Sequence, residues 1–500
     1  MKIFNFLIII AAFVISFASC SEDFLDADNS AYLTSETAKE LAEIDPATLD
    51  AYPRGMWAFM VKFNIQGGGS HDDFSFMSIL HSTDMMCENI TMMASSHFIY
   101  DYDIDNREYN YRRTNVNWRV FYTLIAKANE IISFFPEEPS SVDSKGLIGQ
   151  AYAIRGMSYY YLIQLYQHSV TDGGQVNGSA PGIPMIFSDT EGLSEDETKK
   201  LKGRNTVSDV HKQIENDLTK AVTYLEAGYS RPSKMYINAN VANGFLARYY
   251  LLSQQWEKAA EAAKKAHSSL NIMGENDLHD GFMNLANAEW MWGFDHNTET
   301  QTTYASFFSH ISNLAPGYAG ISYAPRGIDA RLYGLIPESD YRKSLFNGPD
   351  GNTTTPTAAS RRPYAALKFG DTGDWTMDYV YMRASEMVLI EAEAYARLGR
   401  GENAATALKK LMDKRDPQWN RTSVDVDDIY LQRRIELWGE GFGYFDLKRL
   451  NLGIDRNYEG SNHMVGYKHV VPAQDKKWIY QIPIAEIQEN KSIEDREQNP

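Results

Sequence analysis

Several stretches of the chain place apolar residues at helical spacing. Within 117–135, Val120, Leu124 and Ala128 recur every fourth residue and form one face of an amphipathic helix. A Gly- and Pro-rich insertion over 168–205 interrupts this pattern and cannot be continuous helix. Similar patterns predict further helices over 34–49, 49–63, 146–167 and 205–225.

Two segments repeat the same arrangement of small and aromatic residues. Ala247 and Ala259 are twelve residues apart, and Ala392 and Ala404 repeat that spacing 145 residues later. This pattern is typical of tetratricopeptide-type hairpins, in which small residues let two antiparallel helices approach closely. Stacked hairpins bury a continuous core and leave loops to carry function. We predict a mainly α fold, a tetratricopeptide-like scaffold with long loop insertions and a few short strands, with hairpins over about 117–167, 205–269 and 381–414.

Two long segments, about 66–115 and 270–380, lack this periodicity and are rich in polar and aromatic residues. The second contains the apolar run Glu289–Phe294, which predicts a short buried strand. Long irregular segments of a compact domain are often functional. Aromatic rings can stack on the apolar faces of sugars while polar side chains bond the hydroxyls, so this mixture suits a carbohydrate site. For any single tyrosine, a local core under the loop is the alternative.

The N-terminus has the pattern of a secretory signal. Lys2 precedes the apolar run Ile3–Phe17, which is too short to span a membrane, and two small residues lead to Cys20. This arrangement resembles a bacterial lipobox. We expect a signal peptide over 1–19, acylation of Cys20 and a flexible tether over 20–33; plain secretion with an incidental cysteine is the alternative.

Composition narrows the class of function. The net charge of −18 argues against a nucleic-acid partner, because an acidic surface repels phosphates. If Cys20 carries lipid, Cys87 is the one remaining cysteine and cannot form an intrachain disulfide. The sequence has no G-x-S-x-G, H-E-x-x-H or C-x-x-C signature. A glycosidase needs only two carboxylates and remains a less favoured alternative.

We expect no cofactor. Asp101, Asp103 and Asp105 have the spacing of the first half of a calcium loop, but Asn106 stands where that loop needs glycine. Arg112 stands where the loop needs a bidentate glutamate. A calcium ion held by a less regular set of oxygens remains open.

Three motifs resemble those of the RagB/SusD family. Tyr381–Gly399 (YMRASEMVLIEAEAYARLG) is similar to the family helix R-x-A-E-x-x-L-x-x-A-E-A. Arg433–Leu450 (RRIELWGEGFGYFDLKRL) resembles R-R-x-E-L-x-x-E-G-x-R-x-x-D-L-K-R, with Gly443 in place of the usual basic residue. Ile482–Pro500 resembles the ending I-P-x-x-E-I-x-x-N-x-x-x-x-Q-N-P. The resemblance covers 34–500 as a single domain, of which 427–500 is the C-terminal motif segment.

The resemblance implies a non-enzymatic lipoprotein on the outer membrane, facing the cell exterior. Such proteins capture oligosaccharides for a SusC-like TonB-dependent transporter in a polysaccharide-utilisation system. The motifs are structural in character and identify no ligand residue. A transporter assembly or lid subunit with little glycan affinity of its own is the alternative. From the two loop-rich segments we choose the ligand candidates Asp72, Asp84, Asn89, Trp292, Tyr304, Tyr318 and Tyr323.

Overall fold

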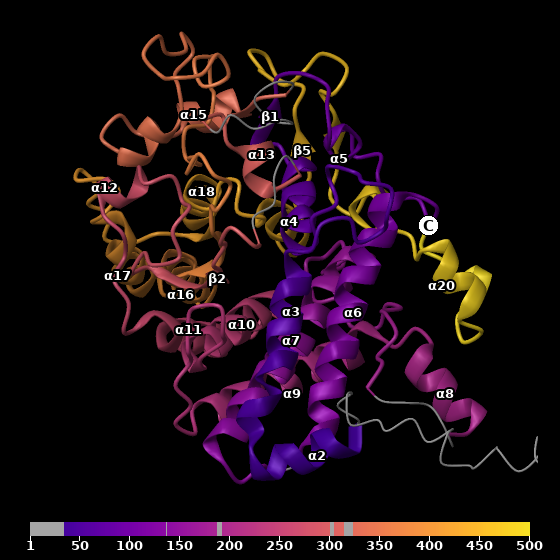
Figure 1. Ribbon diagram of the computed structural model, residues 1–500. Coiled ribbons are helices and arrows are strands. Elements are labelled where there is room, and N and C mark those ends of the chain that lie inside the picture. The colour runs from indigo at the N-terminus through magenta and orange to yellow at the C-terminus, as the bar shows by residue number, and fades with distance from the viewer. Residues whose placement is uncertain (1–34, 137, 188–192, 301–304, 315–323) are drawn as a thin grey trace, which may run out of the picture.

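The computed structural model describes residues 35–500 except 137, 188–192, 301–304 and 315–323 (Figure 1). The longer helices are α2 (Ser35–Ile44), α3 (Ala51–Met60), α4 (Phe76–Met85), α6 (Arg112–Phe134), α7 (Val142–Tyr166), α8 (Glu195–Lys202), α9 (Val207–Leu225), α10 (Ala239–Leu252), α11 (Trp256–His267), α16 (Ala384–Arg397), α17 (Gly401–Met412), α18 (Val426–Glu436) and α19 (Gly443–Arg449). The shorter helices are α5 (Ile99–Tyr102), α12 (Glu275–Leu278), α13 (Phe307–Ile311), α15 (Ala330–Gly334) and α20 (Ile484–Glu489), with 3-10 turns at η3 (Pro46–Asp50), η4 (Tyr341–Leu345), η5 (Lys476–Trp478) and η6 (Asp495–Glu497). The strands are β1 (Ile90–Met92), β2 (Trp290–Phe294), β3 (Arg326–Ile328), β4 (Tyr379–Arg383), β5 (Ile454–Asp455) and β6 (Val470–Val471).

The long helices form a stack of antiparallel hairpins. Helices α6, α7, α9, α10, α11, α16 and α17 each pack against the next, and Figure 1 shows them curving through the lower part of the molecule. Ala247, Ala259, Ala392 and Ala404 are fully buried where the paired helices meet. The structure therefore confirms the mainly helical, tetratricopeptide-like scaffold.

Helices α7 and α9 form the hairpin that the insertion splits. A Cβ atom on Gly156 would lie 2.8 Å from Leu218 Cδ2, so the absence of a side chain lets the helices touch. Beside this contact, Arg155 donates to both carboxylate oxygens of Asp217 at 2.9 and 2.7 Å. The pair is buried, and it ties the two halves of the hairpin together.

The two sequence repeats also share their turn geometry. Gln254 lies between α10 and α11 with φ of 59°, and Gly399 lies between α16 and α17 with φ of 73°. These positions are 145 residues apart, as are Ala247 and Ala392. A left-handed residue ends the first helix of each hairpin, which is the usual way to reverse the chain after a helix.

One element in the first loop-rich segment differs from the sequence prediction. Residues 76–85, for which no helix is predicted, form α4, and all ten side chains of this helix are buried. A helix enclosed on every side has no polar face, so its sequence lacks the amphipathic period. In the second segment, β2 confirms the predicted buried strand and pairs antiparallel with β4.

Strand pairing joins the two loop-rich segments. Strand β1 pairs antiparallel with β3, with Ile90 opposite Ile328, and Met93 N donates to Pro325 O at 3.1 Å. Figure 1 shows β1, α5, α13 and α15 together above the helical stack. The two segments therefore form one end of the molecule.

The C-terminal segment returns to the first third of the chain. Asn499 Nδ2 donates to Tyr166 O at 2.7 Å, and Arg107 donates to the carbonyl oxygen of Pro500. The Tyr102 hydroxyl lies 2.5 Å from His463 Nδ1. These contacts hold residues 102–107 and Tyr166 against the segment 463–500.

Candidate functional site

We define the loop face as five polar and aromatic residues of the first loop-rich segment: His71, Asp72, His97, Tyr100 and Arg112. Tyr100 is exposed, and the other four are half-buried. The phenol of Tyr100 is largely free, since this residue is 69% exposed. The His71 and His97 rings stack, with centroids 4.4 Å apart and planes 7° apart. The loop face thus combines flat rings with a carboxylate and a guanidinium at one end of a packed scaffold.

Asp72 is the charged centre of the loop face. Its carboxylate accepts from Ser70 Oγ at 2.6 Å and forms an ion pair with Arg112, while Arg113 Nη2 donates to its backbone oxygen at 2.9 Å. Burial alone would raise the pKa of Asp72, but the Arg113 and Arg112 guanidiniums hold it well below its usual value. The Asp72 side chain is 14% exposed, so a fixed acceptor remains within reach of a ligand.

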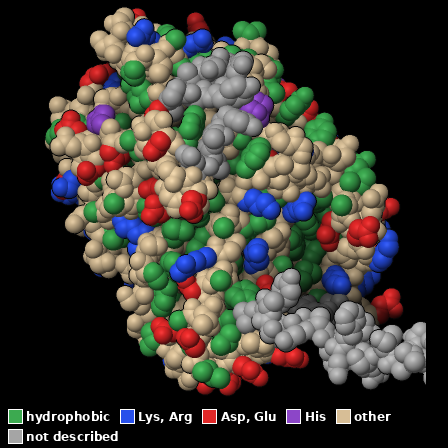
Figure 2. Space-filling view, viewed as in Figure 1, with side chains coloured by type: hydrophobic (Ala, Val, Ile, Leu, Met, Phe, Trp, Pro, Cys, Tyr) green, Lys and Arg blue, Asp and Glu red, His purple; other side chains and the backbone are tan. Residues whose placement is uncertain are grey.

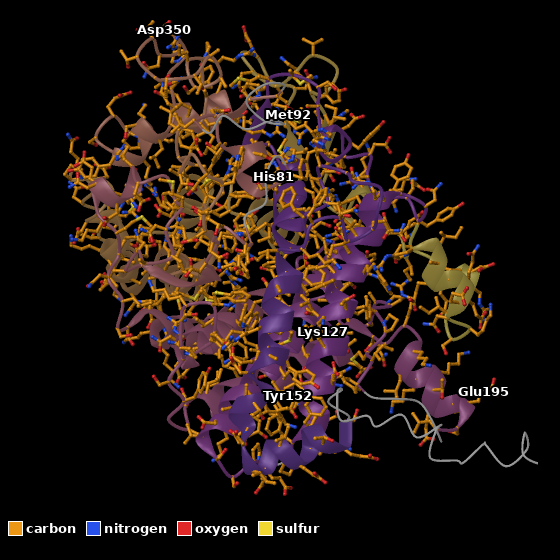
Figure 3. All side chains as sticks on the ribbon, in the orientation of Figure 1. His81, Met92, Lys127, Tyr152, Glu195 and Asp350 are labelled. Carbon is orange, nitrogen blue, oxygen red and sulfur yellow. The ribbon has the colours of Figure 1, made fainter. Side chains whose placement is uncertain are left out.

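Buried groups support the two stacked imidazoles from below. His310 Nε2 on α13 lies 2.9 Å from His71 O, and Arg326 Nη2 on β3 lies 3.5 Å from His97 O. His81 on α4 lies deeper in the same region (Figure 3). Burial lowers the pKa of His71 and His97, so both rings are neutral at pH 7. Each can then donate and accept one hydrogen bond.

The other described ligand candidates do not lie on this surface. Trp292 is fully buried, and its indole nitrogen donates to Met235 O at 2.9 Å, so its ring has no free face for a sugar. Asn89 Oδ1 accepts from Arg434 Nε at 2.8 Å, a contact that fixes the loop to α18. Asp84 is also enclosed. Trp292 and Asp84 are thus buried within the scaffold, and the half-buried Asn89 is bound to Arg434; of the described candidates, Asp72 belongs to the loop face.

Tyr304, Tyr318 and Tyr323 lie outside the described residues, as does the predicted lipidation site Cys20. Within the described ranges, no helix combines the length and apolar character needed to cross a bilayer. The three tyrosines and Cys20 stay predictions.

The charged residues of the second motif lie inside the molecule. Glu436 accepts hydrogen bonds from Arg383 at 2.7 Å, Arg415 at 2.9 Å and Arg342 at 3.1 Å. Burial would raise the pKa of Glu436, but Arg415 and Arg383 hold it well below its usual value. Glu440 accepts from Arg383 in the same way, at 2.8 Å. These ionised groups satisfy one another and link β4 to the C-terminal segment, so the motif serves the scaffold.

Gly443 stands where the motif usually has a basic residue. Its N–H donates to Asp84 Oδ1 at 3.0 Å, and Gly441 N donates to Oδ2 at 2.7 Å. A Cβ atom at Gly443 would lie 3.3 Å from Asp84 Oδ1, so a basic side chain here would begin beside the carboxylate. With glycine in its place, two backbone amides are the hydrogen-bond partners of Asp84.

Four residues of the loop face are absent from the ligand candidates chosen from the sequence, which include Asp72 alone of this group. His71, His97 and Tyr100 belong to the polar and aromatic set of 66–115, but nothing in an irregular stretch tells which side chains face outward. In the sequence, Arg112 shows only that the spacing of a calcium loop is incomplete. Its ion pair with Asp72 depends on a contact forty residues apart, for which the sequence carries no signal.

The stacked hairpins and the loop face define the class: a tetratricopeptide-like scaffold protein whose inserted loops form its exposed polar surface. Residues 69–251 match a family model described as starch-binding associating with outer membrane, and residues 344–500 match the model of the SusD family. The chain belongs to the SusD/RagB family. This confirms the resemblance seen in the three motifs.

Individual relatives agree with this assignment. The chain is 23% identical over 384 residues to SusD-like protein P2 of Formosa agariphila, covering 67% of this chain and 71% of that protein. A SusD-like carbohydrate binding protein from Bacteroides vulgatus has the same fold, with a TM-score of 0.77, 24% identity and coverage of 91% and 98%. Surface glycan-binding protein A from Bacteroides uniformis aligns with a TM-score of 0.64, 16% identity and coverage of 90% and 99%.

Proposed function

We propose that this protein is a non-enzymatic glycan-binding lipoprotein of the outer membrane. In this proposal a lipid on Cys20 anchors it, facing the cell exterior, and it delivers oligosaccharides to a SusC-like TonB-dependent transporter. The observation that carries the proposal is the loop face, where flat rings and fixed charged groups meet on a rigid scaffold. Membership of the SusD/RagB family and the glycan-binding names of two structural relatives support it.

The loop face offers the two kinds of contact that a sugar ring needs. The Tyr100 ring, in a residue that is 69% exposed, offers a flat surface to the apolar C–H face of a sugar ring, and the half-buried His71–His97 pair lies in the same segment. Asp72 accepts from hydroxyls and Arg112 donates to them, and charge-assisted bonds of this kind are the stronger ones. Their ion pair already fixes both side chains, which reduces the entropy lost on binding.

The chemistry of the carboxylates favours binding over hydrolysis. A glycosidase needs a carboxylic acid with a raised pKa in contact with its substrate, and a second carboxylate nearby. Asp72 has a lowered pKa and two arginine partners. Asp84 has a raised pKa but is enclosed in the scaffold. Neither therefore suits the role of a general acid.

Isothermal titration tests the proposal. The chain from residue 21 onward would be titrated with oligosaccharides from starch, plant cell wall and mucin. We expect saturable binding to one class, lost when Tyr100 and His97 are both changed to alanine. Ile44→Ala is the control, since Ile44 is 81% exposed on α2, away from the loop face. Absence of heat with every class from a folded chain would refute glycan capture and favour the assembly-subunit alternative.

A further inference from the structure

A second surface feature adjoins the loop face. A groove of about 930 Å³ runs between α6 on one side and α8 and α20 on the other. Figure 2 shows it as a hollow lined by hydrophobic side chains, with Lys and Arg side chains on the neighbouring surface. Its polar lining includes Gln66, Asn115, Arg119, Lys202, Glu486 and Asn490. The groove is open along its length, so a chain molecule could lie in it.

The upper end of the groove is continuous with the loop face. Arg112 begins α6 and Asn115 lines the groove; the two are three residues apart and therefore lie on the same side of the helix. Both are half-buried, so this side of α6 links the loop face to the groove. A ligand that contacts the Asp72–Arg112 pair can therefore continue into the groove without leaving the surface.

The floor and rim of the groove differ in role. The Trp118 and Tyr122 rings pack together with centroids 4.6 Å apart, and Trp118 Nε1 donates to Glu486 at 3.3 Å across the groove. These contacts hold its two walls in place. Arg119 on α6 is exposed, and within the described ranges it makes no ion pair or hydrogen bond. Its guanidinium is free to bond paired hydroxyls of a sugar.

We infer that the groove extends the glycan site, and that the ligand is an oligosaccharide of several units. This inference rests on the proposed function and specifies its substrate class. One end of the chain binds at the loop face, and the following units lie along α6 as far as Ala126. That stretch of helix, from Arg112 to Ala126, is about 20 Å long. A mono- or disaccharide would occupy the loop face alone and gain nothing from the groove.

The test is a length series of the glycan class that binds in the titration, from disaccharide to octasaccharide. We expect affinity to rise with length until the groove is filled. Arg119→Ala should weaken the longest ligand about tenfold, the effect of losing a charged hydrogen bond, and leave the disaccharide unchanged. Ala126→Trp, at an exposed position in the groove, should block the long ligand in the same way.

Lys127→Ala is the matched control. Lys127 is a cation on the same helix, two turns beyond Arg119, and it does not line the groove (Figure 3). Equal affinity for disaccharide and octasaccharide, with the loop-face variants still disrupting both, would overturn the inference and leave glycan capture standing. Loss of long-chain affinity with Lys127→Ala equal to that with Arg119→Ala would also overturn it. Absence of binding at any length would remove both proposals.

Discussion

Asp84 should make the stability of this protein depend on pH. Its carboxyl group is 4% exposed and accepts from two backbone amides, Gly441 N at 2.7 Å and Gly443 N at 3.0 Å. Burial raises the pKa of Asp84 from 3.8 to about 7, because enclosure outweighs the two amides. The folded protein therefore keeps a proton that the unfolded chain releases at lower pH.

The change of stability with pH depends on the difference in the Asp84 pKa between the folded and unfolded states. Between about pH 4 and pH 7 the folded state binds one more proton than the unfolded state, so the free energy of unfolding falls as pH rises. A shift of about three pH units corresponds to about 4 kcal/mol in total. Below pH 4 and above pH 7 this group should contribute no slope.

Urea unfolding of the wild type and of Asp84→Asn, at a series of pH values from 4 to 8, measures this directly. Asparagine does not titrate. Its NH2 group cannot accept the hydrogen bond of one backbone amide, which lowers the stability of the variant by an amount that does not change with pH. We expect the free energy of unfolding of the wild type, measured relative to that of Asp84→Asn, to fall by several kcal/mol between pH 4 and pH 7. Asp350→Asn, on an exposed loop (Figure 3), controls for removal of a carboxylate. A difference that stays constant with pH would show that the amides keep Asp84 ionised, and would refute the reasoning.

Three further changes test the scaffold. Gly399→Ala should lower the free energy of unfolding by about 1 kcal/mol in urea titration, because alanine resists the left-handed φ and no atom crowds the site; an unchanged midpoint would contradict this. Asp217→Ala should lower the free energy of unfolding by about 3–5 kcal/mol, because the buried Arg155 guanidinium loses its carboxylate partner. A loss of less than about 1 kcal/mol, as for an exposed ion pair, would contradict this. Trp292→Ala should cost about 3–5 kcal/mol in thermal unfolding, yet leave the glycan affinity of the folded protein unchanged; selective loss of affinity would return Trp292 to the site.

The sequence predicted the helices that have one buried and one exposed face. Helix α9 is such a case, since Val210, Ile214 and Leu218 are buried while the opposite side meets solvent. Helix α4 is buried all round and has only ten residues, too few for an apolar run to be identified as a helix. Helix α7 is also buried on nearly every side, but its 25 residues exceed the length of a strand. Exposure in the irregular segments could not be predicted for a different reason. Whether Asn89 is free or occupied depends on Arg434, 345 residues away, and local patterns carry no information on such pairs.

The return of the chain end to residues 102–107 has a consequence for the order in which the protein forms. Arg107 and Tyr166 bind the last two residues, Pro500 and Asn499, and Tyr102 contacts His463. A chain made from its N-terminus can form each helical hairpin soon after synthesis, since the partners are close in sequence. The contacts of residues 102–107 and Tyr166 with residues 463–500 can form only after that later segment has been made. A nascent chain would therefore carry a folded stack of hairpins whose loop end is not yet held in place.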